Sequence, residues 1–306
     1  MERKRRAELG VTGKVAFVFP GQGAQYVGMG KELAMAFPIV SDTLKAADEA
    51  LGEQLSQRLF QGPEELLRQT YYTQPAIVAM SVAVARLTMQ FIQPFCVAGH
   101  SLGEYSALVV AGSLSLEDAL CVVRERARLM EEAVPPGTGT MAAVIGIEPQ
   151  KVQEICDLAG GRGIVEPATF NGGGQVVMSG TVAGVEAATR LALEAGARRV
   201  QPLRVSGPFH SSLLQSAGER LRDVLDQVEL KPCRIPVYCN VHADRVETPE
   251  EIREALVAQV SSPVRWEETV LTMGCDGVDT FLELGPRRIL SGLVRRIDSK
   301  AQVLSI

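Results

Sequence analysis

Apolar and polar positions follow two periods along this chain, and together they predict an α/β fold. Continuous apolar runs at 15–19 and 95–98 are typical of strands buried on both faces. The run over 76–89 is apolar with helical spacing, and a further helix is predicted to begin at 104–111, just after the second strand. Because strand and helix patterns alternate, we expect a parallel sheet covered by helices on both faces.

The segment over 138–204 has a different pattern, entered through Pro135-Pro136-Gly137. The predicted elements are, in order, strand 141–147, helix 149–159, strand 164–170, strand 175–179, helix 182–195 and strand 197–205. This β-α-β-β-α-β order is the ferredoxin-like arrangement. The sequence therefore predicts a small ferredoxin-like α+β domain, at 138–204, inserted into a larger α/β domain formed by 14–137 and 205–306.

Composition narrows the class of protein. The 306 residues are 46% hydrophobic and 22% charged, which is ordinary for a protein with a large core. The net charge of −5 gives no indication of a nucleic-acid partner, and no apolar run approaches the ~20 residues that a membrane helix needs. The basic start, within residues 1–13, lacks the apolar core of a secretion signal, so we expect a flexible N-terminus.

Six cysteines lie at 96, 121, 156, 233, 239 and 275, without any Cys-x-x-Cys pair. Several fall in apolar runs, which favours reduced, buried thiols and a cytoplasmic protein. The three histidines lack ligand spacing to these cysteines, so no metal site is predicted.

Gly99-His100-Ser101-Leu102-Gly103 lies between a predicted strand and a predicted helix. Glycines on either side of a serine allow a sharp turn that projects the hydroxyl from its tip. This is the nucleophile elbow pattern, so the large domain is expected to be α/β-hydrolase-like, with Ser101 as nucleophile. Free amides at the start of the following helix can stabilise an oxyanion. The alternative is a simple turn, because so short a pattern also occurs by chance.

The glycine-rich stretch Gly21-Gln22-Gly23-Ala24-Gln25-Tyr26 does not indicate a nucleotide site. Tyr26 stands where a dinucleotide fingerprint has its third glycine, and no Lys followed by Ser or Thr completes a P-loop. A glycine loop after a strand is instead suited to bring a backbone amide close to a reacting atom.

A serine nucleophile needs a general base, and only three histidines are available. His100 adjoins Ser101, and successive side chains at a tight elbow point in different directions. His210 follows 205–209, where a strand end breaks into a loop, and it is the better candidate. A surface histidine is the alternative for His210, and His242 is a minor candidate for the base.

Arg126 falls on the apolar stripe of a helix that Ser115 is predicted to cap, whereas Arg124 and Arg128 fall on the opposite face. A guanidinium on an apolar face is costly without an anionic partner. That partner is either a structural carboxylate or the carboxylate of a substrate. A third alternative is that the side chain extends to the surface and keeps its charge in solvent. The spacing alone does not choose among the three.

Six motifs, in order along the chain, resemble those of the malonyl-CoA:acyl carrier protein transacylases of fatty acid synthesis and the related acyltransferase domains of polyketide synthases. The resemblance covers Phe17 to about Ile297. The motifs are Gly21-Gln22-Gly23-Ala24-Gln25, Thr73-Gln74-Pro75-Ala76, Gly99-His100-Ser101-Leu102-Gly103-Glu104, Arg126 before Met130, Gly207-Pro208-Phe209-His210, and Gln259 before Pro263-Val264-Arg265-Trp266.

The resemblance implies a role for each of several residues. Ser101 would be the nucleophile and His210 the base, oriented by the backbone carbonyl of Gln259. The oxyanion hole would be the backbone amides of Gln22 and Leu102. Four side chains would bind substrate: Arg126 through the malonyl carboxylate, Phe209 as in malonyl-selecting relatives, Asn171 at the pantetheine arm, and Gln74.

The function that the resemblance implies is transfer of malonyl from malonyl-CoA to acyl carrier protein by a ping-pong mechanism, supplying fatty acid synthesis. No cofactor is expected, since malonyl-CoA is a substrate, and a monomer is the family default. Because carrier proteins of this family are acidic, a basic docking patch is expected, with candidates Arg198, Arg199, Arg287, Arg288, Arg295 and Arg296.

Two other functions remain open at this point. A serine hydrolase or thioesterase shares the elbow, although its acid is unassigned here and Arg126 would lack a purpose. A non-catalytic module that binds acyl carrier protein would leave Ser101 unmodified.

Overall fold

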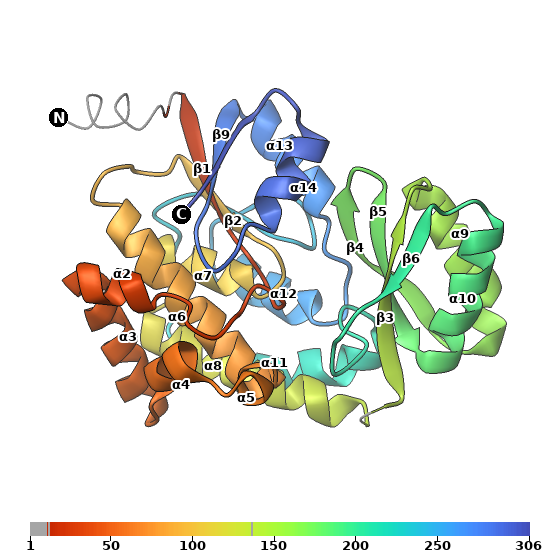
Figure 1. Cartoon of the computed structure of the whole chain (residues 1–306), viewed down its shortest axis with the longest axis horizontal. Helices are drawn as coiled ribbons and strands as arrows, with labels where there is room; N and C mark the ends of the chain where they lie inside the picture. Colours follow the sequence, from red (N-terminus) through yellow and green to blue (C-terminus); the bar gives the residue numbers. More distant parts are fainter. Residues whose placement is uncertain (1–10, 12, 136) are drawn as a thin grey trace.

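The computed structural model describes residue 11, residues 13–135 and residues 137–306. Two sheets organise this part of the chain, a large one within a group of helices and a small one beside it (Figure 1). The prediction for 1–13 lies outside the described residues except at Val11 and Gly13, and Val11 is buried in the main core.

The large sheet has six strands in the order β10-β9-β1-β2-β7-β8. All neighbouring strands are parallel except β7 and β8. The predicted parallel sheet is therefore confirmed, with one antiparallel edge strand that is too short to leave a sequence pattern. The strands are β1 (Lys14–Phe19), β2 (Cys96–Gly99), β7 (Val237–Tyr238), β8 (Arg245–Val246), β9 (Val278–Glu283) and β10 (Gln302–Ser305).

Both faces of the large sheet are buried, as the continuous apolar runs predict. Along β1, Val15 and Phe17 point into the main core, whereas Ala16 and Val18 point into a second core on the other face. The main core is covered by α2 (Lys31–Ala36), α3 (Pro38–Leu51), α4 (Leu55–Gln61), α5 (Glu64–Leu67), α6 (Thr70–Thr88), α7 (Gly103–Val110), α8 (Leu116–Ala133), α11 (Gln215–Leu225) and α12 (Pro249–Gln259).

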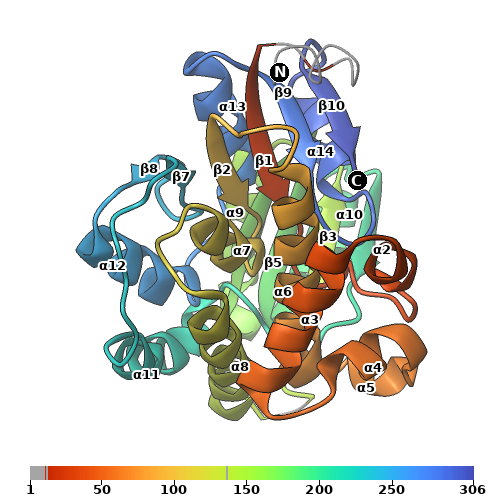
Figure 2. The ribbon, with the colours of Figure 1, turned by 90° about the vertical axis from the view of Figure 1, so that its left-hand side faces the viewer.

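The second core is covered by α13 (Trp266–Cys275) and α14 (Leu290–Ile297). Figure 2 shows α3 and α6 running side by side, with α14 beside β9 and β10. In Figure 1, α13 and α14 lie between the large sheet and strand β4 of the small sheet. No described helix is both long and apolar enough to cross a membrane.

The small sheet is antiparallel, in the order β4-β5-β3-β6, which is the ferredoxin-like order. Its last strand is shorter than the predicted 197–205. It begins later because Ala197 still closes the preceding helix, its amide donating to the carbonyl of Ala192. The elements are β3 (Gly139–Ile145), α9 (Pro149–Ala159), the 3-10 turn η1 (Gly160–Arg162), β4 (Val165–Gly172), β5 (Gln175–Thr181), α10 (Val182–Glu194) and β6 (Arg199–Pro202).

The two faces of the small sheet have different neighbours. Val144 and Met178 face α9 and α10 in a third core. Met141 and Val177 belong instead to the main core, so this face closes over the large part of the molecule. The division into 14–137 with 205–306 and 138–204 stays a prediction. The short turn η2 (Ser212–Leu214) follows the return to the large part.

Candidate active site

Ser101 lies on the turn between β2 and α7, and its backbone has a φ of 51°, which is unusual for a residue with a side chain. The two flanking glycines are needed by the turn itself. A Cβ on Gly99 would lie 1.8 Å from the carbonyl carbon of Gly103, and one on Gly103 would lie 2.1 Å from the carbonyl oxygen of Phe19. The predicted strand, turn and helix are thus all present, with the hydroxyl at the tip.

His210 lies opposite the serine, although the two residues are far apart in sequence. Ser101 Oγ and His210 Nε2 are 2.6 Å apart, and His210 Nδ1 is 2.9 Å from the backbone oxygen of Gln259. Because Nδ1–H donates to that carbonyl, Nε2 is left as the acceptor for the serine proton. Burial, followed by the nearby charge of Arg126, lowers the pKa of His210 to about 3, so the imidazole is neutral.

The other two histidines do not contact the serine hydroxyl. His242 is exposed at the surface. The His100 ring turns toward the small sheet, where its Nε2 is 2.8 Å from Asn171 Oδ1, and burial lowers the pKa of this histidine. The sequence argument that His100 and Ser101 point in different directions therefore agrees with the structure.

Arg126 is buried with only 2% of its surface exposed, on the face of α8 that its spacing predicts. Its Nη1 donates to Gln74 Oε1 at 3.0 Å and its Nη2 to Gln259 Oε1 at 3.1 Å, with Ser101 Oγ at 3.5 Å from Nη2. Within the described chain no carboxylate forms a salt bridge with it. Burial lowers the pKa of this guanidinium. The helix is capped as predicted, by Ser115 Oγ accepting from the amide of Asp118.

Glu104 and Asn240 support the site, and the sequence argument assigned a role to neither. Asn240 Oδ1 accepts the amide of Ser101 at 2.6 Å, and Asn240 Nδ2 donates to the carbonyl of Gly99 at 2.6 Å. Glu104 Oε2 accepts the amide of Asn240 and Nε2 of Gln259, both at 2.9 Å. Burial raises the pKa of Glu104 to about 7.

Two signals in the sequence point to these residues. Glu104 directly extends the glycine–serine motif. Asn240 comes just after β7, and the carboxyl ends of parallel strands carry ligand sites in open α/β sheets.

A cavity of about 410 Å³ opens onto Ser101 between the large part and the small sheet. Gln22 and Leu102 line it, and within the described residues neither of their backbone amides donates to another protein group. Their amides are therefore available to a bound oxygen. Much of the remaining lining is apolar and comes from both parts of the molecule: Met130, Met141, Val177, Leu203, Phe209 and Leu293.

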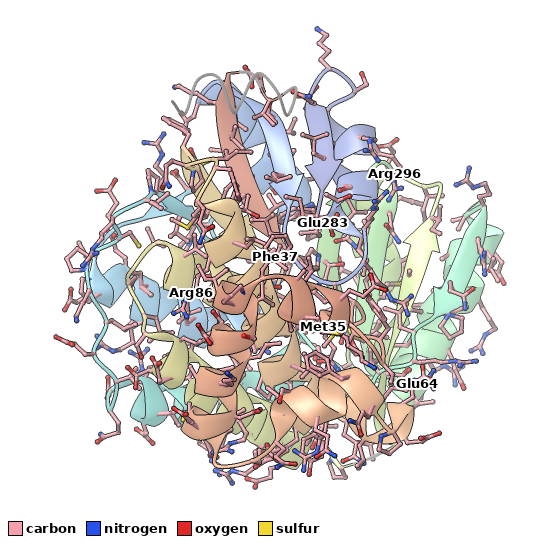
Figure 3. The ribbon with its side chains drawn as sticks, turned by 60° about the vertical axis from the view of Figure 1, so that its left-hand side comes forward. Met35, Phe37, Glu64, Arg86, Glu283 and Arg296 are labelled. Atoms are coloured by element: carbon pink, nitrogen blue, oxygen red, sulfur yellow. The ribbon has the colours of Figure 1, made fainter. Side chains whose placement is uncertain are left out.

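The remaining predicted residues fall in three places. Phe209 and Asn171 line the cavity, the latter from β4. Gln74 is buried beneath it on α6, with its oxygen on Arg126. The six docking candidates are all exposed, and Figure 3 shows Arg296 on α14 beside the small sheet, in agreement with the 3.4 Å bond from its Nη2 to Gln175 Oε1.

Loop 284–289 leads into α14 at the mouth of the cavity, and hydrogen bonds to the side chain of Glu283 hold its end in place. Glu283, at the inner end of β9 (Figure 3), accepts the backbone amides of Ile289, Leu290 and Ser291 at 2.7–2.8 Å. These bonds fix the start of the helix that carries Leu290 and Leu293 into the cavity wall.

Comparison with known proteins shows extensive similarity. The model of the acyl transferase domain matches residues 16–303. The malonyl CoA-acyl carrier protein transacylase of Bacillus subtilis is 45% identical over 295 residues, covering 96% of this chain and 93% of the relative. The enzyme of the same name from Escherichia coli K12 is 43% identical over 284 residues, 92% of each chain.

Two solved structures are similar over nearly the whole chain. The acyl carrier protein S-malonyltransferase of Vibrio cholerae has a TM-score of 0.94 at 43% identity, with 96% of both chains covered. The same values hold for a malonyl-transacylase solved in complex with its type II PKS acyl-carrier protein.

Proposed function

Since this chain belongs to the acyl transferase family, and within it to the malonyl CoA-acyl carrier protein transacylases, we propose that it transfers malonyl from malonyl-CoA to acyl carrier protein. The observation that carries the proposal is that a base and a cation both lie against one nucleophilic oxygen. Ser101 Oγ has a neutral imidazole at 2.6 Å and, at 3.5 Å, a buried cation that forms no salt bridge with any described residue. A nucleophile, a base and a carboxylate receptor are what malonyl transfer through a serine ester requires.

In the first half-reaction His210 Nε2 takes the proton of Ser101 as Oγ attacks the thioester carbon. The positive charge that forms on the ring is stabilised through Nδ1–H and the carbonyl of Gln259. The amides of Gln22 and Leu102 hold the oxyanion. The carbon–sulfur bond then breaks, the coenzyme A thiolate takes the proton from His210, and a malonyl-serine ester remains.

The second half-reaction reverses these steps with a different thiol. His210 takes the proton of the phosphopantetheine thiol, whose sulfur attacks the ester carbon. The bond to Ser101 Oγ breaks, and the serine regains its proton from the imidazole. The product is malonyl-acyl carrier protein, the extender unit of fatty acid synthesis.

Arg126 determines which acyl group is held in this scheme. Its guanidinium binds the free carboxylate of malonyl by charge-assisted hydrogen bonds, close to the ester oxygen. Phe209, next to the base, limits the space beside the acyl group, and Asn171 on the facing wall contacts the pantetheine arm.

Intact-protein mass spectrometry after mixing with malonyl-CoA tests the ester directly. We expect one malonyl adduct on the wild type and none on Ser101→Ala. A wild type without an adduct would indicate a binding module. Free malonate that accumulates faster than malonyl-acyl carrier protein would indicate a hydrolase.

Arg126→Ala tests the receptor. Loss of a charge-assisted pair in a dry site costs on the order of 3 kcal/mol, so malonyl transfer should fall roughly 100-fold more than acetyl transfer. Arg128→Ala is the matched control, because Arg128 lies on the same helix but is exposed and paired with Glu125 and Glu132. Equal loss with both acyl groups would mean that Arg126 is structural.

A further inference from the structure

The guanidinium of Arg126 is held by neutral oxygens. Gln74 Oε1 accepts from Nη1 at 3.0 Å and Gln259 Oε1 accepts from Nη2 at 3.1 Å. A buried arginine is ordinarily paired with a carboxylate, because the charge is costly to bury otherwise. Here two amides fix its position without neutralising it.

The hydrogen-bond network connects Arg126 to one carboxylate, that of Glu104, but only through the side chain of Gln259. Glu104 Oε2 accepts from Gln259 Nε2 at 2.9 Å, so the Gln259 amide lies between the anion and the cation. When it is ionised, Glu104 compensates the charge of Arg126 at a distance and leaves the guanidinium free of direct contact with an anion.

Gln74 acts on this site through Arg126 alone. It is 1% exposed, its oxygen is bonded to Arg126, and its Nε2 is 3.9 Å from the sulfur of Met130. Among the described residues, those that line the cavity include Arg126 but not Gln74, so a ligand there meets the guanidinium and not this amide. Gln74 is therefore a positioning residue.

We infer that Gln74 determines acyl selectivity by being uncharged: it orients Arg126 while reserving the charge of the guanidinium for the carboxylate of the incoming acyl group. This inference rests on the proposed malonyl transfer. A carboxylate at position 74 would form the ion pair in advance, and a second anion would then find the cation neutralised.

Gln74→Glu is the direct test, since it keeps the shape of the side chain and changes only its charge. We expect it to lower the ratio of kcat/KM for malonyl-CoA to that for acetyl-CoA at least about tenfold, mainly through a higher KM for malonyl-CoA. Gln74→Met is the matched control, because it removes the oxygen without adding charge. It should keep more of the selectivity than Gln74→Glu.

Ratios of the two substrates are measured on one preparation of each variant, so a partly unfolded sample does not alter them. Gln74→Glu with the wild-type ratio would overturn the inference, and so would Gln74→Met with selectivity as low as that of Arg126→Ala. The proposed function fails separately, if the wild type forms no malonyl-serine ester or if Arg126→Ala keeps full selectivity.

Discussion

The low pKa of His210 predicts how serine malonylation responds to acid. The base acts only when its Nε2 is unprotonated, and burial together with Arg126 lowers the pKa of this ring to about 3. Protonation of His210 therefore removes activity only when the pH approaches that value. At pH 5.5 more than about 99% of the base would be neutral, against roughly 9% for a histidine of ordinary pKa near 6.5.

The measurement is a quenched time course of malonyl-enzyme formation, followed by intact mass between pH 8 and pH 5. We expect kcat/KM, which reports on the free enzyme, to lose less than about twofold from the titration of His210 over this range. A roughly tenfold loss at pH 5.5, with a midpoint near 6.5, would refute the argument.

The pKa of His210 should be higher in the malonyl-CoA complex than in the free enzyme. Arg126 is the second cause of the low pKa of His210, and a bound malonyl carboxylate would neutralise it. The pKa of His210 should then rise, so the acid limb of kcat should lie at a higher pH than the acid limb of kcat/KM. With acetyl-CoA the two limbs should be closer together.

Glu104 titrates in the same experiment and requires a control. Burial raises the pKa of its carboxyl to about 7. A limb near pH 7 that disappears in Glu104→Gln belongs to Glu104, whereas a limb that persists in this variant belongs to another group.

Two further predictions concern the supports of the site. Asn240→Ala leaves the amide of Ser101 without its acceptor, so we expect a loss of roughly 1–3 kcal/mol in the free energy of unfolding and slower malonylation, measured by denaturant titration and adduct formation; unchanged values for both would remove Asn240 from the support. The pKa of Glu104 is near 4.5 in the unfolded chain and about 7 in the folded protein. Its contribution to the free energy of unfolding is therefore fully present below pH 4.5 and is lost as the pH rises through about 7. Glu104→Gln should therefore flatten the dependence of Tm on pH between these values, and an unaltered slope would contradict the assignment.

The elbow could be predicted from the sequence because its physics is local. Gly99 and Gly103 are required by contacts within five residues and with β1, and the spacing of Gly-x-Ser-x-Gly records this requirement. The ferredoxin-like unit could likewise be predicted, since each of its strands and helices has its own period. The place of Arg126 on the apolar stripe of one helix could also be predicted, but the spacing left open whether its guanidinium is buried.

The polar network could not be predicted because its members meet only in three dimensions. Asn240 and Ser101 are 139 positions apart, and Gln259 and Glu104 are 155 apart. Their pairing depends on how β7 aligns with β2 and on where α12 ends, which no local pattern records. The edge strand β8 was missed for a different reason, since two residues are too few to show a period.

The pairing of β3 with β6 brings the entrance and the exit of the small sheet side by side. The chain therefore leaves the small sheet close to where it entered it. The residues that transfer the proton come from one part of the chain, whereas Met141 and Val177, which form one wall of the cavity, come from another. This wall of the cavity can therefore change in sequence without any change in the residues that transfer the proton.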